Sequence, residues 1–142
     1  MYKRQPKDTD RDAAWELYVE LLTRITTQPL DDEHGDEKTA LDSVYSLFGL
    51  TRQTLKHQGR HCTEFAKIAV IVLNQVVRPF TAKWHGDSLA GEFNQPKHRK
   101  EFRDELRELQ EKLQHYSKLL AYLAGVEDMT EITNVKIGES EG

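Results

Sequence analysis

A heptad pattern between residues 102 and 123 is the sequence feature that most constrains the fold. Large apolar side chains recur there at alternating spacings of four and three: Phe102, Leu106, Leu109, Leu113, Tyr116, Leu120 and Leu123. This spacing places all of them on one side of an α-helix. Pro96 suits a first helical turn, and Gly125 suits a helix end. We therefore predict a helix over 96–125 whose seam packs against other helices of the chain, with a second chain as the alternative partner.

Three further segments have the periodicity or boundaries of helices. The first begins near Asp8 and ends before Pro29, the second follows the acidic loop 31–37 and ends at Gly59, and the third runs from about Arg60 to His85. Proline disfavours helical angles in the preceding residue, and glycine readily adopts the left-handed angles of a helix cap. The apolar stripe expected on the second helix comprises Ala40, Leu41, Val44, Tyr45, Leu47, Phe48 and Leu55.

The third predicted helix carries two apolar stripes side by side. One consists of Phe65, Ala69, Val72 and Val76, and the other of Ala66, Val70, Leu73 and Val77. A helix with two apolar faces is expected to pack against two neighbours. Pro79 near its end lacks a backbone N–H, so we predict a kink there, with the carbonyl of Gln75 left without its usual partner.

These segments predict an all-α fold, an antiparallel up-down four-helix bundle over residues 1–125, followed by a flexible acidic tail over 126–142. The chain has 142 residues, which suits one domain, and a net charge of −4. The whole of this negative charge is carried by the tail, so the bundle itself is formally neutral. A neutral bundle excludes the broad basic surface of a dedicated duplex-DNA binder.

Cellular location follows from cysteine usage and hydropathy. Cys62 is the single cysteine, so no internal disulfide forms, and the longest purely apolar run is the six residues 68–73. A bilayer span requires about 20 apolar residues, and disulfide-free chains are typical of reducing compartments. We predict a cytoplasmic protein that does not enter a membrane.

Basic residues gather at the start of the last predicted helix, at Lys97, Arg99, Lys100 and Arg103. Cations are disfavoured at a helix N-terminus because the partial charge there is positive. This cluster is therefore a candidate anion- or partner-binding site. The alternatives are pairing with the acidic loop 31–37 and a solvated charge patch.

A metal site would need ligands that this chain does not gather. His57, His61 and Cys62 are close in sequence, but Gly59 interrupts the helix between them and a fourth ligand is missing. The acidic loop lacks the ligand spacing of a calcium loop. We predict that the protein holds no metal and no cofactor.

The third helix also carries a polar line, interrupted by Ile71: Lys67, Asn74, Arg78, Thr81 and His85. Arg78 and His85 are seven residues apart, two helical turns along one face. An arginine can hold a phosphate while an imidazole moves a proton near neutral pH. These two residues are the candidate catalytic pair.

The stretch from Arg78 to His85 resembles the motif of the HEPN superfamily, all-helical and often dimeric ribonucleases with an arginine four to six residues ahead of a histidine. Six residues lie between them here, and Pro79 replaces the polar residue that usually follows the arginine. The resemblance implies a metal-independent ribonuclease or toxin-system component acting through Arg78 and His85. Alternatively, Arg78 neutralises nearby acids while Phe80 and Trp84 cap the core.

No phosphate-binding glycine loop, Ser-His-Asp signature or paired-carboxylate motif occurs in the chain. The sequence therefore favours a non-enzymatic helical-bundle subunit, with an interaction or regulatory role exerted through protein contacts or self-association into an oligomer. The HEPN-like ribonuclease is the alternative, and it would make nucleic acid a partner.

Overall fold

The computed structural model describes residues 7–24, 37–89 and 91–130, and all regular structure within these ranges is helical. The elements are α1 (Asp8–Leu22), α2 (Glu37–Gln58), α3 (Thr63–Val72), the π-helix η1 (Leu73–Val77), α4 (Arg78–Leu89), the 3₁₀ turn η2 (Glu92–Asn94) and α5 (Pro96–Ala124). Because α3, η1 and α4 follow one another without a break, the described residues form four long helical segments. The prediction of an all-α protein with four helices is confirmed.

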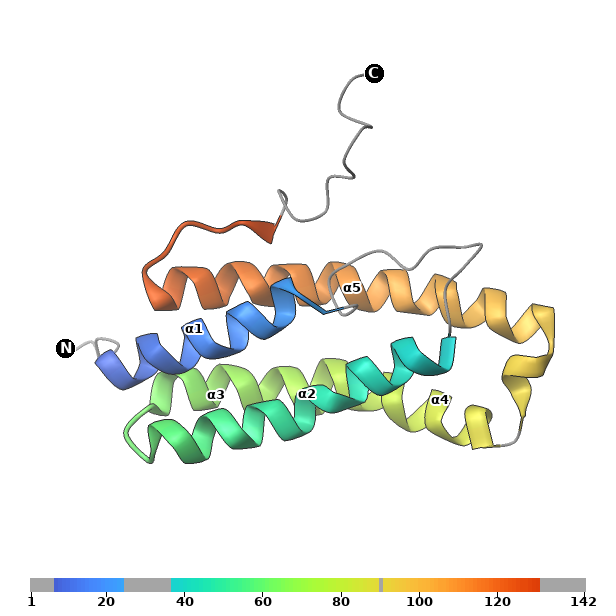
Figure 1. The fold of residues 1–142 in the computed structure, drawn as a ribbon, viewed down its shortest axis with the longest axis horizontal. Coiled ribbons are helices and arrows are strands. Elements are labelled where there is room, and N and C mark those ends of the chain that lie inside the picture. The colour runs from blue at the N-terminus through green and yellow to red at the C-terminus, as the bar shows by residue number, and fades with distance from the viewer. Residues whose placement is uncertain (1–6, 25–36, 90, 131–142) are drawn as a thin grey trace, which may run out of the picture.

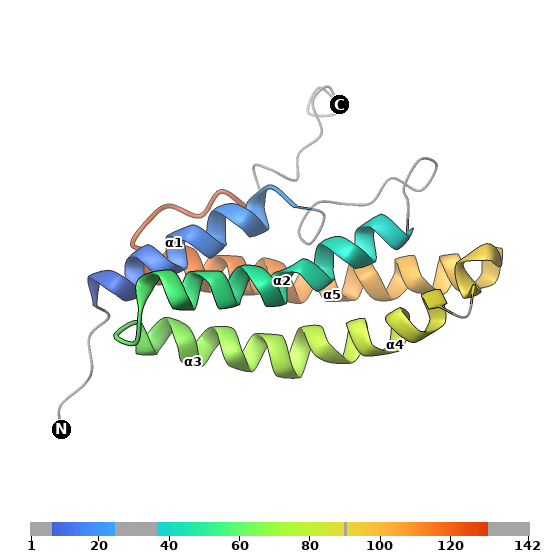
Figure 2. The same cartoon turned by 60° about the horizontal axis from the view of Figure 1, so that its bottom comes forward.

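The longest helix, α5, runs along the molecule, and the other segments pack on it (Figures 1 and 2). The short helix α1 covers the half of α5 that ends at Ala124, and it also contacts α2 and α3. The other half of α5 is covered by α4 and η2. The chain turns from α2 into α3 at one end of the molecule and from α4 into α5 at the other (Figure 1).

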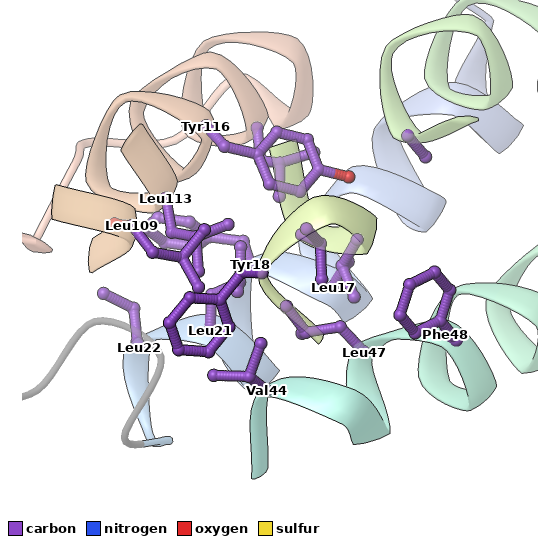
Figure 3. Close-up of a cluster of buried hydrophobic side chains, with 14 of the residues drawn as sticks. Leu17, Tyr18, Leu21, Leu22, Val44, Leu47, Phe48, Leu109, Leu113 and Tyr116 are labelled. Atoms are coloured by element: carbon purple, nitrogen blue, oxygen red, sulfur yellow. The ribbon is translucent and has the colours of Figure 1, made fainter. Parts of the chain in front are cut away.

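The hydrophobic core lies along the heptad seam of α5, all seven of whose residues are buried. Figure 3 shows Leu109 and Leu113 of this seam beside Tyr18 and Leu21 of α1, with Val44 of α2 nearby. The seam is therefore filled by the chain's own helices. Burial of such side chains from water is the main source of stability for a bundle of this kind.

Two glycines end helices as the sequence predicts. Gly59 follows α2 with φ of +83°, and Gly125 follows α5 with φ of +76°. At the second, the N–H of Val126 donates to the carbonyl of Ala121 at 3.0 Å, which closes the last turn of α5. Both positions require left-handed angles that a side chain would strain.

The third segment departs from the prediction just before Pro79. Residues 73–77 form a π-helical turn, in which the N–H of Arg78 donates to the carbonyl of Leu73, five residues earlier. A π turn holds one residue more than an α turn. The widened turn ends at Val77, two residues before Pro79, whose missing N–H disrupts the regular hydrogen-bond ladder of an α-helix.

The extra residue explains why this segment shows two apolar stripes in the sequence. In α3 the buried residues Phe65 and Ala69 belong to the first stripe, whereas the buried Val77, the last residue of the π turn, belongs to the second. The burial pattern continues through Phe80 and Trp84. One helix face thus stays against the core, while the residue numbers on that face shift by one.

This arrangement predicts that a deletion inside the π turn is tolerated. Removing Gln75, combined with Pro79→Ala, converts the turn to regular α-helix and leaves the buried faces of α3 and α4 in phase. We expect cooperative thermal unfolding to persist, measured by circular dichroism. The matched control is deletion of the exposed Ala82, which turns Trp84 about 100° out of the core. Equal loss of cooperative unfolding in both deletions would contradict this account.

Residues 126–130, at the start of the predicted tail, return to α1. The Tyr18 hydroxyl donates to Asp128 Oδ1 at 2.9 Å and accepts the N–H of Met129 at 2.5 Å, and Thr130 is buried. Burial acts to raise the pKa of Asp128, but hydrogen bonds from Thr130 and Tyr18 outweigh it and hold that pKa below its ordinary value. The folded unit therefore extends past Gly125 to Thr130, and the rest of the predicted tail lies outside the described residues.

The continuous helix from Thr63 to Gly86 has a mean hydropathy of 1.3 in its most apolar window, and 28% of that window is buried. By length and composition alone, it is apolar enough to cross a membrane, a property shared by core helices of soluble proteins. Among its described residues, the large hydrophobic side chains that are exposed are Val70 and Ile71, at 45% and 53% exposure.

Candidate functional site

The two residues singled out as a catalytic pair, Arg78 and His85, line one surface pocket between α2 and α4. The pocket has a volume of about 310 Å³, and its wall comprises Tyr45, Phe48, Arg52, Arg78, Thr81, Ala82 and His85. The α2 residues are spaced three and four apart, and the α4 residues lie within two turns of one face. The pocket therefore arises where one side of α2 faces one side of α4.

Arg78 is held in the pocket by two contacts. Its guanidinium carbon lies 4.9 Å from the centre of the Phe48 ring, and its Nε donates to Asn74 Oδ1 at 3.2 Å. A guanidinium over an aromatic face is attracted by the ring quadrupole. These contacts orient the guanidinium before any ligand is present, which reduces the entropy lost on binding.

His85 stands next to an exposed tyrosine. Its ring stacks on Tyr45 with a centroid distance of 6.0 Å and an interplanar angle of 29°, and Tyr45 leans on Phe48 at 5.6 Å. Tyr45 is 54% exposed. The prediction that Tyr45 widens the apolar stripe of α2 toward the core is therefore wrong, because Tyr45 is exposed and lines the pocket.

The charge of the pocket wall is positive. Arg52 and Arg78 contribute two permanent cations, and none of the lining residues that the structure describes is a carboxylate. Such a wall attracts anions and can offer several N–H donors to a phosphate.

Sequence reasoning did not place Arg52 and Tyr45 in this site. The offset between α2 and α4 depends on the turn at Gly59 and on the extra residue in the π turn, neither of which the apolar pattern specifies. The helical spacing of Tyr45, Phe48 and Arg52 was visible in the sequence, but it did not show which residues of the next helix they would meet.

At the second predicted site, at the start of α5, the basic side chains have more of their partners within the protein. Arg99, Lys100 and Arg103 line a hollow of about 390 Å³ together with Pro96, Asp104 and Arg107. Arg99 donates to the carbonyl of Phe93 at 2.8 Å, and Lys100 lies 3.4 Å from Asp104. Lys97 is exposed and does not line this hollow.

Arg103 forms a buried ion pair with Glu37. Its Nη2 lies 2.5 Å from Glu37 Oε2, and the two side chains are only 14% and 9% exposed. Glu37 is the last residue of the acidic stretch 31–37, so pairing between that stretch and the basic cluster occurs at this position. Residues 31–36 lie outside the described part of the chain.

Two of the candidate metal ligands near Gly59, His57 and Cys62, have other partners. His57 Nδ1 is 2.7 Å from Glu16 Oε1, and the Cys62 thiol donates to the carbonyl of Gly59 at 3.1 Å. Burial, helped by the negative charge of Asp10, raises the pKa of the Cys62 thiol. Within the described ranges, no three His, Cys, Asp or Glu side chains are placed to hold a metal ion.

Comparison with known proteins returned no match: no protein-family model, no curated protein and no solved structure is similar to this chain. The resemblance to HEPN proteins therefore stands on residues 78–85 and the helical fold alone.

Proposed function

We propose that this protein binds RNA through the α2–α4 pocket and cleaves it there as a metal-independent, HEPN-like ribonuclease. One observation carries the proposal: Arg52, Arg78 and His85 come from two helices to line a single pocket, and none of the described lining residues is a carboxylate. Arginine is the side chain best suited to hold a phosphate through paired hydrogen bonds.

The same groups suit phosphodiester transfer within RNA. The 2′-hydroxyl attacks the neighbouring phosphorus, the bond from phosphorus to the 5′ oxygen breaks, and a 2′,3′-cyclic phosphate forms. His85 would accept the proton from the 2′-hydroxyl and return a proton to the departing 5′ oxygen. The guanidinium groups of Arg52 and Arg78 would stabilise the charge that develops on the phosphate oxygens.

Binding is tested first, with a short fluorescent single-stranded RNA and anisotropy. Arg78→Gln removes a charge-assisted hydrogen bond worth about 1.5–3 kcal/mol, so we expect affinity to fall at least about tenfold. Losing one phosphate contact should also make the slope of log K against the logarithm of salt concentration shallower by about 0.7. The matched control is Arg107→Gln on α5, whose arginine lies 3.1 Å from Asp104 and outside the pocket. Equal losses in the two variants would contradict a site at Arg78.

Cleavage is tested with the same RNA carrying a 5′ label. We expect products that end in a 2′,3′-cyclic phosphate, and no products from a 2′-deoxy substrate. His85→Gln should abolish cleavage without changing helicity by circular dichroism. Binding without cleavage by the unaltered protein would overturn the ribonuclease step and leave the RNA-binding pocket in place.

A second candidate function is the non-enzymatic interaction subunit, in an oligomer or a complex with another protein. Its support is exposed apolar surface, with Ile71 of α3 and Leu119 and Tyr122 of α5 at 51% exposure or more. We also propose that the four helical segments form an antiparallel up-down bundle. The interaction subunit would present these exposed residues to a partner in the cytoplasm. His85→Gln would then be silent, and Ile71→Glu would shift the mass measured by light scattering on a size-exclusion column.

A further inference from the structure

The exposed Tyr45 in the lining of the α2–α4 pocket indicates which form of RNA the site takes. We propose that the pocket binds single-stranded RNA and that one unpaired base stacks on the ring of Tyr45. This inference rests on the proposed function, since it names the substrate class of the same site. Tyr45 would be a binding and specificity residue, separate from the phosphate contacts of Arg52 and Arg78.

The setting of Tyr45 differs from that of an aromatic residue that serves only the core. The ring is supported within the protein by His85 and Phe48, at centroid distances of 6.0 and 5.6 Å, yet the residue is 54% exposed. Phe48, one turn further along α2, is 9% exposed and does belong to the core. Tyr45 is thus a supported aromatic surface that is open to solvent.

The neighbouring groups supply the other half of a nucleotide site. Arg52 lies seven residues from Tyr45 on α2, and Arg78 holds its guanidinium against Phe48 from the facing helix. Proteins that bind single strands combine such cations, which contact the backbone, with aromatic rings on which bases stack. The volume of about 310 Å³ is at the lower end of the range for ligand pockets, which suits one nucleotide unit.

A duplex does not satisfy the same site. Its bases are stacked on each other inside the helix, so none offers a free face to a side chain, whereas unpaired bases do. The pocket wall therefore selects single strands by stacking, while the arginines contribute attraction to any phosphate backbone.

The test compares three ligands of equal length by anisotropy: a single-stranded RNA, the same strand in a duplex, and a strand whose central nucleotides are abasic. The unaltered protein should bind the single strand at least fivefold more tightly than either of the others. Tyr45→Leu should lose that fivefold preference, and Tyr45→Phe, which keeps the ring, should retain it. Tyr122→Leu is the matched control, because this tyrosine is 86% exposed on α5 and outside the pocket.

The outcomes separate this inference from the proposed function. If the unaltered protein binds all three ligands equally and Arg78→Gln weakens all of them, the phosphate site stands and base stacking is overturned. If Tyr45→Leu binds the single strand as tightly as the unaltered protein, stacking on Tyr45 is likewise overturned. If the unaltered protein binds none of the three, both proposals fail.

Discussion

Replacing Trp84 with alanine is expected to lower the free energy of unfolding by about 3–5 kcal/mol, the range for deleting a large buried aromatic side chain. Trp84 has no exposed surface. Its ring stacks on Phe93 at 5.8 Å and meets the edge of Phe102 at 5.2 Å, so it joins α4, η2 and α5. Its Nε1 also donates to Glu105 Oε1 at 3.3 Å. The substitution therefore removes apolar contacts and leaves a carboxylate without one of its donors.

The measurement is urea unfolding followed by circular dichroism, with Tyr122→Ala as control. Tyr122 is the most exposed of the aromatic residues Phe102, Tyr116 and Tyr122 on α5. A surface substitution of this kind changes stability by about 0.5 kcal/mol or less. A loss below about 1.5 kcal/mol for Trp84→Ala would show that α4 is not anchored on α5 through this ring. The end of the α2–α4 pocket nearest His85 would then lack its structural support.

Replacing Arg103 with alanine is expected to lower the free energy of unfolding by about 3–5 kcal/mol, because it leaves the buried Glu37 without its charge partner. The pair joins the first residue of α2 to the second turn of α5, where both side chains are nearly excluded from water. The cost arises mainly from the unpaired carboxylate. Glu37→Gln in the Arg103→Ala background should therefore recover part of the lost stability.

The measurement for this pair is a double-substitution cycle of urea unfolding. A positive recovery in the double variant is the result expected for a buried ion pair. Two results together would contradict a buried pair and indicate a solvent-exposed one. They are stability losses of the two single variants that simply add in the double variant, and a loss below about 1 kcal/mol for Arg103→Ala.

Much of the helical framework was predictable from residue spacing. The seam of α5 has an unbroken period of 3.5 residues, so its buried side followed directly from the sequence. The end of α5 at Gly125 followed from the capping angles that glycine adopts. The end of α2 at Gly59 followed from the left-handed angles that glycine adopts without strain. These features depend on neighbours in sequence, which is why a pattern reveals them.

Only half of the candidate site was predictable from the sequence. Arg78 and His85 are two turns apart on one helix, and their common face follows from helical geometry. Arg52 and Tyr45 come from another helix, whose offset depends on tertiary packing. The π turn before Pro79 also changes which residues face the core, and no regular period anticipates an inserted residue.

An NMR titration with single-stranded RNA, following arginine and histidine side-chain signals, shows whether RNA binds between α2 and α4. Binding at the α2–α4 pocket predicts that the Nε–Hε signals of Arg52 and Arg78 and the ring signals of His85 shift together and saturate with one dissociation constant. The signals of Arg99 and Arg107 on α5 should stay in place. Shifts confined to Arg99 and Arg107, or no shifts at all, would contradict an RNA site between α2 and α4.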